Sequence, residues 1–567
     1  MAATVDELTT TARRLRDELA RARFGAATPG AGSATADAAA MVRQLDDHVL
    51  PRLANLDAPA LVVVGGSTGS GKSLLVNSLV GSDVTRPGVL RPTTTSPVLV
   101  HDADSAVWFG AAHVLPGLVR VHEGEARGHH ELRLVTSDAV PAGVALLDSP
   151  DIDSISVENR ALAAELLAAA DLWIFVTTAA RYADAVPWEF LAQARLQGTP
   201  LVIVLNRVPT GAADTVRTHL GEMLAEQGLG DTTIFAIDEQ PLDAARLPTG
   251  SVAPLRVWLD RLGADQEARA DAIRRSLRGS LGDLATRTNA VAAVGDEQLA
   301  AVAGLRTLAR SPYQDALAQV RDDIGKGTLL KGEVLARWEE LLGTGELLRQ
   351  LRTGLGRLRD RITGALSGRP KTDVQFNGAV EHVVETLIRT RGDGAASEAA
   401  TAWRAHPTGA ALLASEAGAG FDRSSADLGR KAGFAVRAWQ GHLLDLVRNV
   451  GGDRRTTGRV LSFGVNGAAI VVMMLVFSHT GGLTGAEVAV AGGAGAVGHT
   501  LLEALLGDQA VRTLAADARS DLEARVRVLY DEERARYDAL LAAIKLDDDA
   551  PARLRALAST IAEAVRL

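Results

Sequence analysis

The stretch Leu61-Val-Val-Val-Gly-Gly-Ser-Thr-Gly-Ser-Gly-Lys-Ser-Leu-Leu-Val-Asn-Ser-Leu79 decides the fold of this chain. Its first four residues are apolar and predict a buried strand, and an apolar helix is predicted after the glycine-rich turn. Between strand and helix, Gly66-x-x-x-x-Gly71-Lys72-Ser73 fits the P-loop pattern. A glycine-rich turn at a helix N-terminus points backbone N–H groups inward, where they bind phosphate. The stretch therefore predicts a cradle for a triphosphate.

Each side chain of the cradle has a predicted role. Lys72 is placed to reach the β- and γ-phosphates, and the Ser73 hydroxyl to bind the Mg²⁺ that bridges them. The remaining residues contribute backbone N–H groups. The predicted cofactor-binding residues of this turn are Gly66, Ser67, Thr68, Gly69, Ser70, Gly71, Lys72 and Ser73.

Length and composition narrow the class of protein. A chain of 567 residues predicts about three or four domains, and an apolar content of 47% is sufficient for large cores. The formal net charge of -9 argues against nucleic acid as a partner. The absence of cysteine excludes disulfides, thiolate metal sites and cysteine nucleophiles. No basic segment leads into an apolar run at the N-terminus, so we expect a cytoplasmic protein without a secretory signal.

The pattern of residues 59–262 is typical of a parallel α/β sheet, because apolar strand-like runs alternate with helical segments. The predicted order is that of a P-loop nucleotide-binding domain. The predicted strands are Leu61–Val64, Val98–His101, Val144–Leu147, Leu172–Thr177, Leu201–Leu205 and Thr233–Ile237.

Helical patterns cover the rest of the chain. Residues 1–58 predict two N-terminal helices that join a helical bundle, with a linker over Gly25–Ala36 and a second helix beginning near Asp37. The bundle itself is predicted over 263–459, and 507–567 is predicted to return to it. Leucines spaced by three and four residues from Leu348 to Ile362 indicate one seam of the bundle. The fold class is therefore an α/β P-loop domain with a large all-α bundle.

A hydrophobic hairpin is predicted over residues 460–506. Val460 to Phe477 is 18 residues without a charge, which as a helix extends about 27 Å, close to the hydrocarbon thickness of a bilayer. A polar glycine-rich turn leads to a second apolar run from Val488 to Leu506. Arginines flank both ends and place them on the cytoplasmic side. We expect a re-entrant contact with membrane lipid at the inner face of the cell membrane; burial of the hairpin within protein is the alternative.

Two further segments supply candidate metal ligands. Arg91-Pro-Thr-Thr-Thr-Ser-Pro97 precedes a strand, where a GTPase switch I supplies a threonine to Mg²⁺. The spacing to Val98 favours Thr94, with Thr93 and Thr95 as alternatives. Val144-Ala-Leu-Leu-Asp148 is an apolar strand ending in an aspartate that can hold Mg²⁺. The predicted metal ligands are thus Ser73, Thr94 and Asp148, with Lys72 and Thr94 as catalytic residues. Asp151 stands where a glycine usually offers its N–H to the γ-phosphate.

The segment Leu201-Val-Ile-Val-Leu-Asn206-Arg207-Val208-Pro209 lies where an N/T-K-x-D motif reads guanine. Asn206 matches the motif, and Arg207 can cover the base, so both are predicted to bind the nucleotide. Pro209 replaces the carboxylate that pairs with guanine, and base preference between GTP and ATP stays open. Phe235-Ala-Ile-Asp-Glu239 is predicted to form a loop near the base.

Together these motifs resemble those of the bacterial dynamin-like large GTPases. The resemblance rests on G-S-T-G-S-G-K-S, R-P-T-T-T-S-P and L-L-D-S-P-D, and on helices that flank the nucleotide domain before a late hydrophobic hairpin. It implies a self-associating protein, alone or with a paralogous GTPase partner, that binds and remodels membrane. Thr68 and Gly69 stand where dynamins commonly carry residues that aid hydrolysis, so hydrolysis is expected to be slow or partner-dependent.

The leading hypothesis is a Mg²⁺-dependent GTPase that couples GTP binding and hydrolysis of the β–γ bond to membrane binding. One alternative is a soluble regulatory or ribosome-associated GTPase with the hairpin buried against protein. Another, motivated by Pro209, is an ATP-using scaffold.

Overall fold

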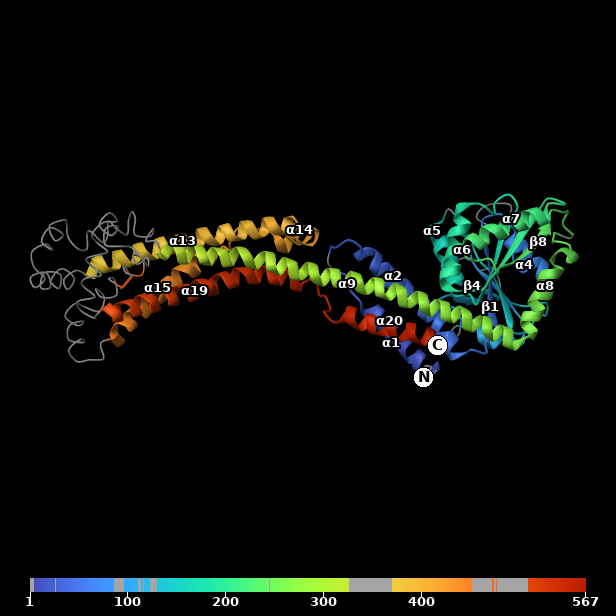
Figure 1. The fold of residues 1–567 in the computed structure, drawn as a ribbon, viewed down its shortest axis with the longest axis horizontal. Coiled ribbons are helices and arrows are strands. Elements are labelled where there is room, and N and C mark those ends of the chain that lie inside the picture. The colour runs from blue at the N-terminus through green and yellow to red at the C-terminus, as the bar shows by residue number, and fades with distance from the viewer. Residues whose placement is uncertain are drawn as a thin grey trace, which may run out of the picture. The chain divides into compact units, whose positions relative to one another are not determined.

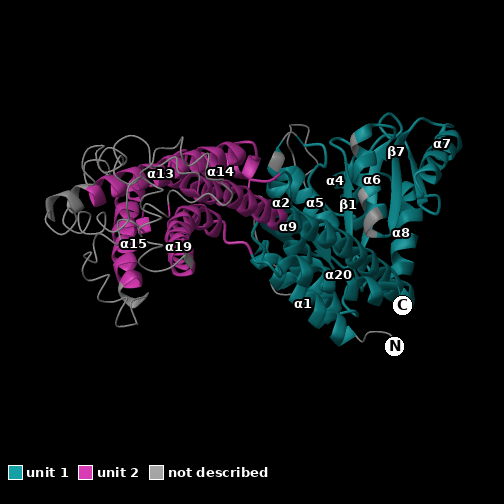
Figure 2. Ribbon diagram, turned by 60° about the vertical axis from the view of Figure 1, so that its left-hand side comes forward, with its two compact units in different colours: residues 1–24, 29–297, 547–567 teal, residues 25–28, 298–546 magenta. Residues whose placement is uncertain are grey.

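The computed structural model describes residues 5–25, 27–85, 96–110, 114–115, 117–122, 130–154, 156–243, 245–325, 370–450, 472–473, 476 and 508–566. These residues form two compact units (Figure 2). Unit 1 comprises residues 1–24, 29–297 and 547–567, and unit 2 comprises 25–28 and 298–546.

The strands of unit 1 form one sheet (Figure 1). It has eight strands in the order β3-β4-β2-β5-β1-β6-β7-β8. All of its pairings are parallel except that between β2 and β5. The strands are β1 (Ala60–Gly66), β2 (Val98–His101), β3 (Val119–Val121), β4 (Glu131–Thr136), β5 (Val144–Asp148), β6 (Leu172–Thr178), β7 (Leu201–Val208) and β8 (Thr233–Asp238). A mostly parallel sheet confirms the predicted fold class.

Two strands of this sheet, β3 and β4, were not predicted from the sequence. They are short or half-exposed, with burial alternating along β4, and therefore lack the continuous apolar run that marks the central strands. By contrast, every residue of β1, β5 and β6 is buried. The central strands were predictable because both of their faces are covered.

Helices cover the sheet on both faces. Helices α4 and α8 share one core with the strands, and α5, α6 and α7 share the core on the other face. Their bounds are α4 (Lys72–Val80), α5 (Val157–Ala168), α6 (Ala185–Gln197), α7 (Ala213–Glu226) and α8 (Thr249–Ala264), with a short 3₁₀ helix at Asp104–Phe109. The buried central strand β1 thus ends at the glycine-rich turn that leads into α4.

A second helical core completes unit 1. Leu15 of α1, Met41 of α2, Leu281 of α9 and Ile561 of α20 are fully or almost fully buried in it. The helices are α1 (Val5–Arg21), α2 (Ala31–Gln44), a π-helical turn at Leu45–Val49, α3 (Leu50–Ala54), the first part of α9 (Gln266–Gly325) and α20 (Ala550–Arg566). Both ends of the chain therefore pack with the segment that follows the sheet.

The second N-terminal helix differs from its prediction. It begins at Ala31 rather than near Asp37, after Gly30 in the left-handed conformation (φ 83°), so part of the predicted linker is helical. The sequence pattern missed this because Ala34 and Ala38 are the buried residues of the first turns, and small side chains give a weak apolar signal. Pro51 is tolerated because it lies at the start of α3, directly after the π-helical turn.

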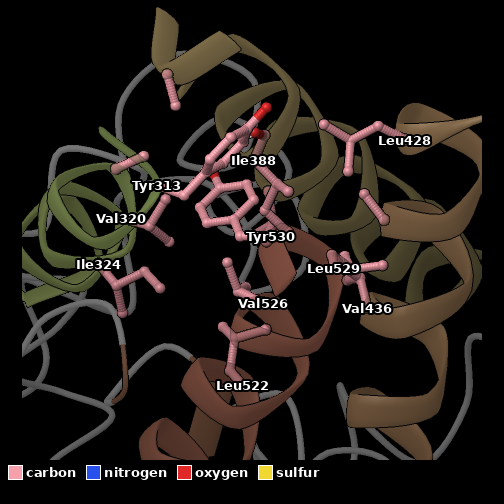
Figure 3. Packing of buried hydrophobic residues seen from close by; sticks show 14 of the residues in the cluster. Tyr313, Val320, Ile324, Ile388, Leu428, Val436, Leu522, Val526, Leu529 and Tyr530 are labelled. Atoms are coloured by element: carbon pink, nitrogen blue, oxygen red, sulfur yellow. The ribbon is translucent and has the colours of Figure 1, made fainter. Parts of the chain in front are cut away.

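The described residues of unit 2 form helices and the turns that connect them, with no strand among them. It contains the second part of α9, α13 (Pro370–Arg404), α14 (Pro407–Ala414), a 3₁₀ turn at Glu416–Gly418, α15 (Leu428–Val450) and α19 (Asp508–Ala542). Tyr313 and Val320 of α9, Ile388 of α13, Val436 of α15 and Val526 of α19 lie in one buried cluster (Figure 3). Spacing by three, four or seven residues along each helix brings these side chains to one core.

The predicted hairpin over 460–506 and the leucine seam from 348 to 362 lie outside the described residues, apart from three positions. Val472, Met473 and Val476 are described, and all three are buried in the core of unit 2. Of the helices that the structure describes, none is both long and apolar enough to cross a membrane.

Candidate nucleotide-binding site

The P-loop forms the turn between β1 and α4. Strand β1 lies between β5 and β6, and the Leu61 N–H donates to Asp171 Oδ2 at 2.7 Å. Asp171 also forms a buried ion pair with Arg52, which donates to the Pro59 carbonyl at 2.8 Å. The strand that carries the P-loop is therefore anchored at its beginning by a buried charge pair.

Two positions of the turn require glycine because atoms of neighbouring residues approach the backbone closely there. Gly66 has φ 150°, and a Cβ there would clash with the Val176 carbonyl of β6. Gly71 has φ 97°, and a Cβ there would lie 2.5 Å from Asn206 Nδ2. Both positions exclude larger residues because the backbone is left-handed or nearly so and because neighbouring atoms fill the space. The spacing that defines the motif thus has a steric cause in this chain.

Lys72 is buried at the N-terminus of α4, with a side chain that is 5% exposed. Its ammonium donates to the Gly66 carbonyl at 2.9 Å and the Ser67 carbonyl at 3.2 Å, and it forms an ion pair with Asp151. The lysine side chain therefore folds back toward the start of the turn. From this position its ammonium can bind phosphate oxygens held by the loop.

Ser73 and Asp148 meet at the adjoining ends of α4 and β5. The Ser73 hydroxyl donates to Asp148 Oδ2 at 2.7 Å. Burial raises the pKa of Asp148 to about 6, against the hydrogen bond from Ser73 and the charge of Lys72, which lower it. A buried carboxylate with an adjacent hydroxyl is the oxygen donor set that Mg²⁺ prefers.

Several buried polar atoms around the loop have no hydrogen-bond partner among the described residues. They include Ser67 Oγ, Ser70 Oγ and Asp148 Oδ1. Buried polar groups in native proteins are almost always paired, so these three unpaired atoms, two in the turn and one at the end of β5, indicate a polar ligand. The residues present therefore fit both a phosphate chain on the loop and a Mg²⁺ ion at Ser73 and Asp148.

A second contact joins the P-loop to the segment after β5. Asp153 Oδ1 accepts from the Thr68 N–H at 2.6 Å and from its hydroxyl at 2.7 Å. Arg181 donates to Asp153 Oδ2 at 3.1 Å and to the Thr68 carbonyl at 3.0 Å. Burial works to raise the pKa of Asp153, but these hydrogen bonds from Thr68 and Arg181 hold it below its ordinary value. Thr68 is thus held by both neighbours.

Arg181 and Asp153 were missed by reasoning from the sequence. Arg181 follows β6, whose carboxyl end lies beside that of β1, and ligands bind at the carboxyl ends of parallel strands. That rule was the signal for Arg181. For Asp153 there was no comparable signal, since its contact with Thr68 depends on how the chain turns after Asp148.

Asn206 and Arg207 lie at the end of β7. The Asn206 amide donates to the Ser70 carbonyl at 2.9 Å, and its oxygen accepts the Arg207 N–H at 2.9 Å. Asn206 is 3% exposed, whereas Arg207 is exposed and has a positive φ of 53°. Asn206 therefore secures the P-loop, and Arg207 follows it in β7 with an exposed side chain.

The structure brings most of the predicted site residues together. The P-loop from Gly66 to Ser73, Asp148 and Asn206 are joined by the contacts above, and Arg207 is adjacent. Thr94 lies outside the described residues, and its predicted role stays a prediction.

Comparison with known proteins gives similarity in structure only. No protein-family model and no curated protein sequence matches this chain. A solved structure of an oligomerised bacterial dynamin pair, described as sensing and tethering membranes, is 11% identical, with 93% of this chain and 92% of that chain covered and a TM-score of 0.43. Era bound to MgGDPNP and a 16S ribosomal RNA segment is 19% identical over 36% of this chain and 56% of that chain, with a TM-score of 0.24.

A variant of Era from Aquifex aeolicus bound to GDP and AlF4⁻ is similar to the same extent, at 18% identity over 35% of this chain and 56% of that chain, with a TM-score of 0.24. These similarities concern the fold alone. The solved structures to which this chain is similar are thus a bacterial dynamin pair and Era.

Proposed function

We propose that this protein is a Mg²⁺-dependent GTPase that binds GTP and hydrolyses its β–γ bond. The observation that carries the proposal is the meeting of Lys72, Ser73 and Asp148 around a glycine-rich turn whose buried serine hydroxyls have no partner in the described ranges. Phosphoryl transfer needs little covalent chemistry from the protein, and positioning with charge neutralisation provides most of the catalysis.

The chain's own residues divide this work. The turn from Gly66 to Gly71 binds the phosphates through its N–H groups, and Lys72 neutralises charge on the β- and γ-oxygens. Ser73 and Asp148 would hold Mg²⁺, which when bound neutralises developing charge between the same two phosphates. Asn206 keeps the loop in place through the Ser70 carbonyl.

Substitution of Lys72 tests the proposal. Lys72→Ala is expected to abolish GTP turnover and to weaken GTP binding, because no other described side chain offers an ammonium to the loop. Lys431→Ala is the matched control, since Lys431 is an exposed lysine of α15 paired with Glu532. Turnover is measured with excess Mg²⁺ and again with a chelator. Unchanged binding and turnover in Lys72→Ala would refute the proposal.

Membrane binding through residues 460–506 forms a second part of the proposal. It is supported by the long uncharged run in the sequence and by the arginines that flank it. The burial of Val472, Met473 and Val476 in the core of unit 2 favours the alternative, in which the segment is packed against protein. We expect self-association to accompany membrane binding, as the resemblance to dynamin-like GTPases implies.

Co-sedimentation with anionic liposomes distinguishes membrane binding by residues 460–506 from packing of this segment against protein. Val471→Asp combined with Leu475→Asp should remove lipid binding while leaving GTP turnover and the melting curve unchanged. If the unsubstituted protein binds no lipid, with or without GTP, then membrane binding is refuted and only the proposed GTPase activity remains. Sedimentation velocity with each nucleotide reports self-association in the same samples.

A further inference from the structure

The end of β7 lacks the carboxylate that its motif requires for reading guanine. Asn206 occupies its expected place against the P-loop, but Pro209 has no side-chain donor or acceptor. A base-reading group must therefore come from elsewhere in space if this site distinguishes guanine from adenine. This inference rests on the proposed function and concerns the same site.

A carboxylate lies directly across the sheet from this position. Strand β8 pairs in parallel with β7, and the register places Asp238 opposite Val208, the residue before Pro209. Neighbouring strands are about 4.8 Å apart. The Glu239 N–H donates to the Val208 carbonyl at 2.7 Å, so the two chains stay joined beyond the end of the strand. Asp238 is thus held one residue from the position where the motif lacks its carboxylate.

The backbone of β7 is irregular at this point. A register shift lies between Leu205 and Val208, and within it Arg207 adopts a positive φ of 53°. Irregularities of this kind re-aim side chains beside functional sites, and a positive φ is uncommon for a residue other than glycine. The irregularity lies between Asn206, which secures the P-loop, and Val208, which pairs with Asp238.

The Asp238 side chain is available for a ligand. Asp238 and Arg207 are both exposed, and within the described part of the chain neither side chain forms a hydrogen bond or an ion pair. The next carboxylate along the chain, Asp214, lies on α7 in an ion pair with Arg217 at 3.7 Å. Asp238 is therefore better placed than Asp214, because it pairs with Val208 at the end of β7 and has no competing partner among the described residues.

We infer that Asp238 reads the base in place of residue 209 and selects a purine with two adjacent donors. The N1–H and the 2-amino group of guanine match the two oxygens of one carboxylate, which accepts only. Adenine presents a lone pair at N1 and no 2-amino group, so it leaves the carboxylate unpaired. Sites built around such a polar contact reject analogues that lack it by large factors.

Asp238→Asn tests this assignment by reversing the base preference. Xanthine has a carbonyl oxygen in place of the 2-amino group, so an amide can donate to that oxygen and accept from N1–H. We expect the full-length Asp238→Asn protein to lose GTP affinity by about ten- to a hundredfold and to gain xanthosine triphosphate affinity by a similar factor. Competition against a fluorescent nucleotide, with Mg²⁺ present, measures both.

Two control variants neutralise neighbouring carboxylates. Glu239→Gln and Asp214→Asn should each keep the order of GTP over ATP and over xanthosine triphosphate. An unchanged ratio of GTP to xanthosine triphosphate in Asp238→Asn, a reversal in either control, or equal binding of GTP and ATP by the unsubstituted protein would overturn the inference while leaving triphosphate binding intact. Failure of every nucleotide to bind the unsubstituted protein would instead refute the proposed function itself.

Discussion

Asp151 forms an ion pair with Lys72, so a carboxylate three residues after Asp148 contacts the lysine of the P-loop. A γ-phosphate needs the same ammonium, and a neighbouring carboxylate also repels its charge. We predict that Asp151→Gly strengthens binding of a non-hydrolysable GTP analogue by about tenfold, with less than about a threefold effect on GDP. Isothermal titration calorimetry with each nucleotide measures the two affinities.

Asp260→Asn is a suitable control for Asp151→Gly, because it removes one exposed carboxylate from α8. It should leave both affinities unchanged. If Asp151→Gly shifts GTP analogue and GDP equally, then Asp151 does not compete with the γ-phosphate.

The buried pair of Arg52 and Asp171 provides a prediction about stability. Their side chains are 5% and 0% exposed, and Asp171 also accepts the Leu61 N–H of β1. Asp171→Asn leaves the Arg52 charge buried without its partner, which typically costs about 3 to 5 kcal/mol. Urea denaturation should show that loss. Asp271→Asn breaks the exposed pair of Asp271 with Arg274 and should cost under about 1 kcal/mol; similar losses from both would contradict the assignment.

Two buried tyrosines of unit 2 differ in one respect that can be measured. The Tyr537 hydroxyl donates to the carbonyls of Ala396 and Phe421 at 3.2 and 3.0 Å, whereas the Tyr313 hydroxyl has no partner among the described residues. Tyr537→Phe should destabilise the protein by about 1 to 2 kcal/mol, and Tyr313→Phe should be neutral or stabilising. Thermal unfolding of both variants tests the contrast, which fails if Tyr313→Phe is the more damaging change.

Asp47 provides a prediction about pH. Burial, with a smaller effect from the charge of Glu165, raises its pKa to about 6 from 3.8. Between these values the folded state keeps a proton that the unfolded state releases, so this group destabilises the fold progressively as pH rises from about 4 to 6. Asp47→Asn removes the effect and should stabilise the protein by up to about 3 kcal/mol at pH 7.5 and about 1 kcal/mol at pH 4.5.

The contribution of Asp47 is measured from urea denaturation of the two proteins at both pH values. His48, also buried, has a pKa lowered by burial to about 4, and its effect has the opposite sign because the unfolded state binds the proton more tightly. Comparing Asp47→Asn with the unsubstituted protein cancels the His48 contribution. A stabilisation that is larger at pH 4.5 than at pH 7.5 would show that the sign is wrong.

The sequence by itself determined the P-loop and the core of the sheet. The steric demand for glycine at 66 and 71 and the need for Lys72 and Ser73 at the start of α4 are local, so they appear as a fixed spacing. The central strands are buried on both faces and are therefore uninterrupted apolar runs. Asp148 was predictable for the same reason, since it ends such a run.

Tertiary structure alone decided which distant side chains meet around that loop. The contacts of Lys72 with Asp151 and of Thr68 with Asp153 and Arg181 join segments far apart in the sequence. So does the pairing of Val208 with Asp238. Register between strands and the path of a turn depend on packing across the whole sheet, and single-sequence periodicity contains no information about either. The residues of the predicted phosphate site could therefore be named from the sequence, whereas the charged side chains around them are brought there by the tertiary fold.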